Sequence, residues 1–322
     1  MQRANTRSPE LSTPQGAADR RTRSLGKRRG KLSQGRAGHA FLAPWLLGFT
    51  VITAGPMVAS LYLSFTDYDL LSSPNWIGFD NFIRMAGDPQ FHSAVRVTII
   101  YVFVSVPLQL ALALLLAVAL DRGVRGLAIY RSAYYLPSLL GGSVAVALLW
   151  RQVFGQEGLI NAVLAIFGVQ GSSWLQNSST ALGTLIILNV WTFGAPMIIF
   201  LAGLRQIPHD LYESALLDGA GAIRRFWSVT VPMLTPMVFF NLILQFIGAF
   251  QAFTPAFVVS SGTGGPNNST LFYTLYLYQQ GFRNFDMGYA AALGWVLLLA
   301  IAVLTLVNFL SSRWWVFYAD EK

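Results

Sequence analysis

The chain has 322 residues and a net charge of +8, but 54% of its residues are hydrophobic and only 11% are charged. Soluble domains average about 25% charged residues, so the composition excludes an ordinary soluble protein. The whole +8 lies in residues 1–38, where ten Lys or Arg face Glu10 and Asp19. This distribution excludes a nucleic-acid surface along the chain, and the absence of cysteine excludes disulfides and thiol chemistry.

Residues 1–38 are polar, basic and rich in Ser, Gly and Arg, and we expect a disordered tail there. A signal peptide is the competing interpretation. The apolar stretch that follows, residues 39–65, is too long for a signal core and is followed by no small-residue cleavage site. We therefore expect it to be a first membrane span, interrupted by Pro44 and Pro56.

Five more apolar stretches follow, each of about 20 residues and long enough to cross a bilayer. Their cores contain no Asp, Glu, Lys or Arg. The sequence therefore predicts an all-α integral membrane protein with six transmembrane helices. The five stretches are residues 96–120, 132–150, 182–204, 233–258 and 287–311.

Lysine and arginine counts set the orientation, because positively charged loops stay in the cytoplasm. With the N-terminus inside, eighteen basic residues lie on the inner side and four on the outer side. We expect both termini to be cytoplasmic, with a tail over 1–38, a six-helix transmembrane domain over 39–315 and a second tail over 316–322. The four outer basic residues are Arg84, Arg96, Arg151 and Arg283.

The longest inner stretch between spans is residues 209–232, which contain two short helical patterns joined at Gly219. Glycine can take positive φ and end a helix without steric cost. Pro232 marks the expected start of span five. Two short amphipathic helices at a membrane face suit docking into a partner's groove. The competing interpretation is an ordinary interfacial loop whose charges meet water and headgroups.

The same stretch resembles the EAA loop of ATP-binding-cassette (ABC) importer permeases, whose pattern is E-A-A, three residues, G, nine residues, I-x-L-P. Glu213, Gly219 and Pro232 keep that spacing. The departures from the pattern are Ser214, Val229 and Val231.

Three further stretches, residues 60–81, 130–161 and 264–270, resemble an outer loop, the third span and the turn after span five of sugar-type permeases. Together the stretches cover about residues 40–315. The chain is most similar to the carbohydrate permeases of the maltose and glycerol-phosphate type, in particular the first permease, which pairs with a second, similar permease.

The resemblance implies an importer of two permeases and an ABC ATPase dimer, with an extracytoplasmic sugar-binding protein, in a bacterial or archaeal plasma membrane. The permease would not be an enzyme and would hold no cofactor, since ATP and Mg²⁺ belong to the ATPase. The cargo would be a di- or oligosaccharide. The coupling loop, between spans four and five, would contact the ATPase through Glu213, Ser214, Ala215, Asp218, Gly219 and Pro232.

Uncharged polar side chains within spans four and five are the candidates for a substrate path, since amides, hydroxyls and aromatic faces bind sugars. The competing interpretation is helix–helix packing through Asn and Gln side chains. The resemblance places Asn189, Thr192, Gln251 and Thr254 nearest the sugar. The full set is Asn189, Trp191, Thr192, Asn241, Gln245, Gln251 and Thr254.

Two other functional classes compete with an importer subunit. A stand-alone secondary carrier or channel is disfavoured because a proton-coupled carrier needs ionisable groups at membrane depth. An intramembrane serine protease needs a histidine there, whereas all three histidines lie at or outside span ends. The chain itself cannot hold ATP by a P-loop, because none of its lysines follows the required glycine pattern. These histidines and lysines are His39, His92, His209, Lys27, Lys31 and Lys322.

Overall fold

The computed structural model describes residues 41–121 and 126–317, so the tail expected over 1–38 and residues 318–322 lie outside the described residues. Within the described residues the chain is helical, with one isolated antiparallel bridge between Thr66 and Trp76 and no strand. The chain divides after Ser60 into two units. The first contributes most of the helix Phe41–Leu63, which contains η1 (Phe49–Ala54) and α2 (Gly55–Leu63).

Among the described residues, four helices are long and apolar enough to cross a membrane, and two bent pairs pass the same test. The bent pairs are α5 (Leu127–Leu140) with α6 (Val144–Val153), and α8 (Ala181–Trp191) with α9 (Gly194–Leu204). The four helices that pass the test singly are Phe41–Leu63, α4 (Pro89–Asp121), the run Ala222–Val259 and α15 (Met287–Trp315).

The span expected over residues 132–150 is not one continuous helix. The structure bends by 97° between α5 and α6. Two adjacent glycines, Gly141 and Gly142, end α5, and the hydroxyl of Ser143 then accepts a hydrogen bond from the N–H of Val146 at 3.3 Å. A serine in this position caps a new helix, so the chain restarts in a different direction.

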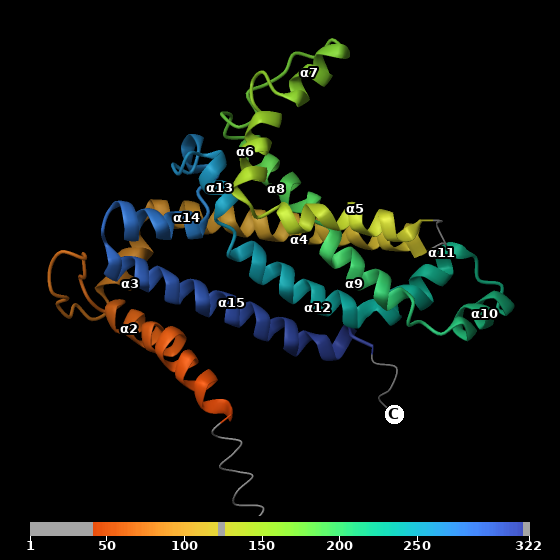
Figure 1. Ribbon diagram of the computed structural model, residues 1–322, viewed down its shortest axis with the longest axis horizontal. Coiled ribbons are helices and arrows are strands. Elements are labelled where there is room, and N and C mark those ends of the chain that lie inside the picture. The colour runs from red at the N-terminus through yellow and green to blue at the C-terminus, as the bar shows by residue number, and fades with distance from the viewer. Residues whose placement is uncertain (1–40, 122–125, 318–322) are drawn as a thin grey trace, which may run out of the picture. The chain divides into compact units, whose positions relative to one another are not determined.

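The remaining elements either connect the long helices or, like α11, η2, α12 and α13, make up the run Ala222–Val259. In the second unit, α10 and α11 lie at one end of the long helices and α3 lies at the opposite end (Figure 1). These elements are α3 (Asp80–Gly87), α7 (Leu159–Ile166), α10 (His209–Leu217), α11 (Ala222–Arg225), η2 (Phe226–Thr230), α12 (Val231–Phe250), α13 (Thr254–Val259), η3 (Pro266–Asn268), α14 (Tyr273–Tyr278) and η4 (Gln279–Arg283).

Helix α4 is the centre of the second unit and packs against α8, α9, α12 and α14. Its buried side chains recur every three or four positions, as one face of a helix requires. Ala113 and Ala117 leave room for close helix packing. The buried set is Ala94, Thr98, Tyr101, Val102, Ser105, Val106, Gln109, Leu110, Ala113, Ala117 and Leu120.

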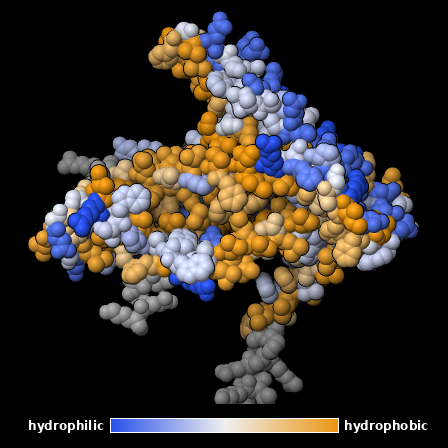
Figure 2. Space-filling view, turned by 180° about the vertical axis from the view of Figure 1, so that it is seen from behind, coloured by the Kyte–Doolittle hydropathy of each residue, from blue (hydrophilic) through white to orange (hydrophobic). Residues whose placement is uncertain are grey.

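The surface is apolar where a soluble protein would be polar. Figure 2 shows hydrophobic side chains covering the middle of the face in view, with hydrophilic side chains toward its ends. Leu299 of α15 is 57% exposed, and Val303 of the same helix is 59% exposed. Contiguous apolar surface of this kind is stable only against lipid or another protein.

A polar cluster ties α14 and α15 to the junction of α3 and α4. The hydroxyls of Tyr276 and Tyr289 both donate to the Asp88 carboxylate, the second at 3.0 Å. Arg84 pairs with Asp286 at 2.5 Å. Burial works to raise the pKa of Asp88, but hydrogen bonds from the two tyrosines and from backbone N–H groups hold that pKa below its usual value. The Asp88 carboxylate therefore stays charged and holds α14 and α15 against the junction of α3 and α4.

Close contact between α5 and α9 generates a prediction. A Cβ atom at Gly194 would lie 2.1 Å from the backbone oxygen of Tyr134. Gly194→Ala is therefore expected to lower the stability of the folded chain by about 1–3 kcal/mol, the usual cost of overpacking. Thermal unfolding of the purified protein in detergent would measure this.

Gly183→Ala is the matched control, because nothing lies within 4 Å of a Cβ atom at that helical position. Equal unfolding temperatures for the two variants would contradict the tight α5–α9 contact.

Candidate functional site: the helix breaks and the Glu213 loop

Three interrupted helices meet at one place in the second unit. The α5–α6 pair breaks at Gly141, the α8–α9 pair bends by 41° at Thr192, and α12 ends at Phe250 before α13 begins at Thr254. All three breaks contribute to the lining of a single cavity of about 310 Å³, here called the break cavity. Irregular backbone at membrane depth is tolerated only where it is buried or lines a cavity.

The break cavity is polar but uncharged. None of its lining residues is ionised, and hydroxyls and amides alternate with aromatic and small side chains. Four of the seven residues expected on the substrate path lie in it. Its lining is Tyr101, Ser138, Gly141, Gly142, Leu188, Asn189, Thr192, Gly248, Gln251, Ala252, Phe253, Thr254 and Pro255.

A hydrogen-bond network holds the α8–α9 break open beside this cavity. The Gln109 amide of α4 donates to the backbone oxygen of Thr192 at 3.0 Å and to its hydroxyl at 2.9 Å. Ser138 of α5 donates to the same backbone oxygen at 2.8 Å. The Asn189 amide donates to Ser105 at 3.0 Å. Two helices, α4 and α5, thus satisfy a carbonyl that the bend removes from its own helix.

Sequence reasoning missed Ser105, Gln109 and Ser138. Ser105 and Gln109 are fully or almost fully buried in α4. They lie four positions apart in an apolar span, so helical periodicity places them on one face. Periodicity does not identify the partner of that face, so it could not reveal that Ser105 meets Asn189 and Gln109 meets Thr192.

Trp191, Asn241 and Gln245 are not among the residues that line the break cavity. Trp191 packs against Trp150, with ring centroids 6.0 Å apart. Asn241 is fully buried in α12, and its amide has no hydrogen-bond partner among the described residues. Gln251, by contrast, lines the break cavity as the C-cap residue that follows the end of α12 at Phe250.

The second site is the Glu213 loop, residues 209–232. Helix α10 ends where Gly219 adopts φ +74°. The Gly219 N–H donates to Leu216 O at 3.0 Å, and the Ala220 N–H donates to Ala215 O at 2.9 Å. This is the Schellman pattern, which needs a left-handed residue after the helix. The expected helix–glycine–helix geometry is therefore present.

Side chains of the Glu213 loop are mostly solvent-exposed in the single chain. Glu213, Ser214 and Asp218 are exposed and Ala215 is half-buried. Leu217 is 90% exposed and lies directly before the glycine turn. Leu216, Ile223 and Trp227 are also exposed, so this segment presents several apolar side chains on its surface.

Pro232 lies in the first turn of α12, as expected, but α12 continues a helical run that already begins at Ala222. One helical run extends from Ala222 through Pro232 to Phe250, with the π-helix η2 directly before the proline. A proline ring displaces the preceding carbonyl, and a π-turn absorbs the displacement. The Thr235 hydroxyl donates to the Pro232 carbonyl at 2.7 Å and replaces the bond that Pro236 cannot make.

The Glu213 loop is also tied to this long run by a side-chain contact. The Tyr212 hydroxyl of α10 lies 3.0 Å from the Thr230 hydroxyl in η2. Helix α10 and the start of α12 are thus hydrogen-bonded to each other, beyond the chain connection through Gly219.

The Thr192 network generates a stability prediction. Gln109→Leu removes both hydrogen bonds from Gln109 to Thr192 and puts an apolar side chain of similar volume in its place. Intramembrane hydrogen bonds contribute about 0.6 kcal/mol on average and at most about 1.7, so a loss of about 1–2 kcal/mol is expected. Chemical unfolding in detergent would measure it.

Leu108→Ala is the control, since that side chain is 51% exposed on the outside of the same helix. A larger loss for Leu108→Ala than for Gln109→Leu would contradict the importance of the network.

Comparison with known proteins identifies the family. Residues 85–318 match the model of the binding-protein-dependent transport system inner membrane component family. The probable ABC transporter permease protein YesP of Bacillus subtilis is 49% identical, over 89% of this chain and 93% of its own. The lactose transport system permease protein LacF of Rhizobium radiobacter is 34% identical, over 86% and 94%.

The arabinooligosaccharides transport system permease protein AraP of B. subtilis is 32% identical, over 86% of this chain and 88% of its own. A crystal structure of a bacterial alginate ABC transporter in complex with alginate pentasaccharide-bound periplasmic protein contains a similar chain. That chain has a TM-score of 0.77 at 21% identity, over 88% of this chain and 96% of its own, a likeness in fold. The chain belongs to the binding-protein-dependent transport system inner membrane component family and is a multi-pass permease of the ABC transporter type.

Proposed function

We propose that the chain is the permease subunit of an ATP-driven importer that carries a sugar, most simply a di- or oligosaccharide. One observation carries the proposal: the helix breaks that contain Gly141, Thr192 and Gln251 converge on one uncharged polar cavity. Discontinuous membrane helices commonly form substrate sites in transporters. Relatives named for lactose and for arabinooligosaccharide transport support a sugar as the cargo.

The chemistry of the break cavity fits a neutral, hydroxyl-rich cargo. Asn189, Gln251 and Thr254 offer donors and acceptors, and Tyr101 and Phe253 offer aromatic faces. A ligand site combines a few polar groups with apolar and aromatic walls in this way. Asn189, Thr192, Gln251 and Thr254 are the residues that we assign to cargo contact. We assign Trp191, Asn241 and Gln245 to packing or to other stages of transport.

We assign the Glu213 loop and both termini to the cytoplasm, on the distribution of basic residues. The chain has no P-loop, so we assign ATP and Mg²⁺ to a partner ATPase dimer, with a second permease and an extracytoplasmic binding protein completing the importer. The layout is a tail over 1–38, a permease domain over 39–315 and a tail over 316–322. Glu213, Ser214, Ala215, Asp218, Gly219 and Pro232 form the coupling segment.

The fold suggests how ATP-driven motion reaches the cargo. The helical run Ala222–Phe250 starts within the Glu213 loop and is followed by Gln251, which lines the break cavity. At about 1.5 Å per residue this run is about 40 Å long. The Tyr212–Thr230 contact and the Gly219 turn connect α10 to the N-terminal end of this run. If the ATPase tilts α10, the helical run would therefore transmit this motion to Gln251 as a rigid element.

A stand-alone carrier or channel is the alternative function. Membership in a binding-protein-dependent family argues against it, and the break cavity has no ionisable lining residue that could bind a coupling proton. We therefore retain the importer subunit.

The coupling assignment predicts different effects for two neighbouring glycines. Gly219→Ala puts a Cβ atom at φ +74°, which costs about 1–2 kcal/mol. We expect about a tenfold loss of ATP-driven uptake and weaker co-purification of the ATPase, with normal membrane insertion. Uptake into proteoliposomes and affinity purification of the tagged chain would measure both.

Gly221→Ala is the matched control, because Gly221 has φ −66° and open space around its Cβ position. A wild-type chain that transports sugar without any ATPase would refute the importer itself. Equal behaviour of the two glycine variants would refute only the coupling role of Gly219.

The cavity assignment predicts a change in cargo affinity. Gln251→Ala removes an amide at the end of α12, and losing one or two neutral hydrogen bonds costs about 0.5–1.5 kcal/mol each. We expect the KM for the transported sugar to rise about three- to tenfold. Gln152→Ala, on α6 and outside the break cavity lining, should leave KM unchanged. A fall in protein abundance with unchanged KM would instead indicate a packing role for Gln251.

A further inference from the structure

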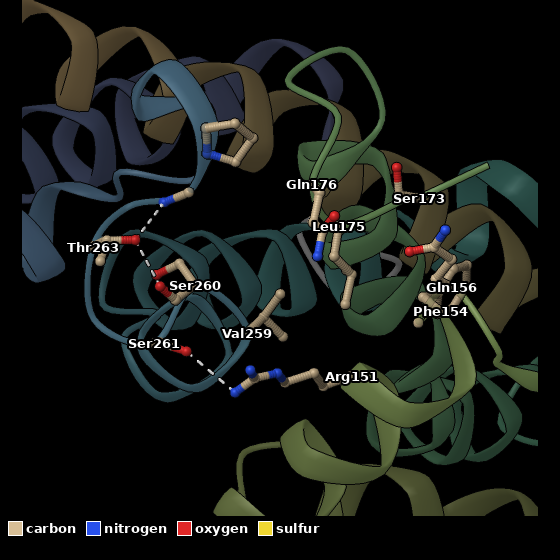
Figure 3. A pocket seen from close by; sticks show the side chains of 13 residues that line it. Arg151, Phe154, Gln156, Ser173, Leu175, Gln176, Val259, Ser260, Ser261 and Thr263 are labelled. Carbon is tan, nitrogen blue, oxygen red and sulfur yellow. Dashed lines mark hydrogen bonds between the residues drawn. The ribbon is translucent and has the colours of Figure 1, made fainter.

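A second cavity, of about 370 Å³, lies between the end of α6 with the segment after it and the turn that follows α13. We call it the outer cavity, because Arg151 belongs to the side assigned to the exterior. Figure 3 shows Arg151 reaching from α6 toward Ser261 of the turn, with Gln156, Ser173 and Gln176 on the far wall. A concave site of this size matches a small-ligand pocket.

Arg151 is the only charged side chain that lines the outer cavity. One of its terminal nitrogens donates to the Ser261 hydroxyl at 3.1 Å. Arg151 forms no ion pair with any residue in the described part of the chain. A guanidinium has five N–H donors in a planar fork that fits a carboxylate. The arrangement therefore leaves most of the fork for an anionic ligand.

The other lining groups suit a ligand rich in hydroxyls. Gln156, Gln176 and Ser173 provide amides and a hydroxyl on one wall, and Thr263 provides a hydroxyl on the other. Phe154 is 7% exposed and adds an aromatic wall. Amides and hydroxyls around an aromatic face bind sugars, and an arginine in such a set adds a preference for an acidic sugar.

The turn that forms one wall is held in shape before any ligand binds. Gly262, Gly264 and Gly265 all have positive φ, which glycine adopts at little cost. The Gly262 carbonyl accepts from Arg283 at 2.8 Å and from Gln279 at 2.9 Å. A preformed site loses less conformational entropy on binding, so the wall can contribute directly to affinity.

Helix α13 connects the outer cavity to the break cavity. Thr254 and Pro255 at its start line the break cavity, and Val259 at its end lines the outer cavity. Six helical residues span about 9 Å. The two cavities are thus close enough for successive units of one oligosaccharide.

We propose that the outer cavity is a second sugar subsite, in which Arg151 binds the carboxylate of a uronic acid unit. This inference rests on the proposed sugar-import function and narrows its cargo to oligosaccharides with an acidic residue. A carboxylate of the binding protein is the other possible partner for Arg151. The amide and hydroxyl walls, the aromatic wall and the link through α13 favour the sugar.

The binding test uses the assembled permease–ATPase complex in nanodiscs, first without binding protein, titrated calorimetrically with digalacturonate and with its methyl ester. The ester keeps the sugar and removes the charge. A charge-assisted hydrogen bond is about twice as strong as a neutral one, so we expect the acid to bind about tenfold more tightly than the ester. Arg151→Gln should make the two affinities nearly equal, mainly by weakening the binding of the acid.

Arg96→Gln is the matched control, since Arg96 is an exposed basic residue on the same assigned side but does not line the outer cavity. It should keep the tenfold preference. Arg151 is also exposed, so its variant should fold, and its unfolding midpoint would verify this.

Equal wild-type affinities for acid and ester, no binding of either, or a preference that survives Arg151→Gln would each overturn the subsite. So would an effect of Arg151→Gln that appears only as weaker binding of added binding protein to the complex. ATP-driven sugar uptake is scored separately, with the complex in proteoliposomes and the binding protein supplied. Uptake without acid preference rejects the subsite alone, whereas a complex that takes up no sugar rejects the importer function.

Discussion

The structure depends on how one carbonyl is satisfied at membrane depth. The bend between α8 and α9 frees the backbone oxygen of Thr192, and Gln109 of α4 and Ser138 of α5 donate to it. An unpaired carbonyl in an apolar medium costs several kcal/mol, so the bend can exist only where these side chains reach it. Because α4 also packs against α9 and α12, the same helix organises the packing around the cavity.

The break cavity and the Glu213 loop lie at the two ends of one helical run. The run from Ala222 to Phe250 carries the loop at one end and Gln251 at the other. Its two prolines do not interrupt it, because a π-turn and the Thr235 hydroxyl compensate for them. The outer cavity is connected to the same run, since α13 begins shortly after Gln251 and leads to the turn beside Arg151.

Much of this could be predicted from residue patterns alone. Apolar stretches of bilayer length predict the spans, because hydrocarbon excludes charge and demands internal hydrogen bonds. The spacing from Glu213 through Gly219 predicts a helix ended by a left-handed glycine, and the structure has it. Four of the proposed path residues lie around one cavity. Pro232 marks the start of α12, as expected, but only the structure shows that the helical run already begins at Ala222.

The sequence by itself determined which segments leave water and where the Glu213 loop turns, since burial in lipid and glycine conformation are local properties. Only the tertiary structure decided where the spans break, which breaks meet, and that Gln109 serves Thr192 from 83 residues away. It also decided that Arg151 lies opposite Gln176 in a second cavity. These outcomes depend on which faces of distant helices come into contact, and helical periodicity identifies a face without identifying its partner.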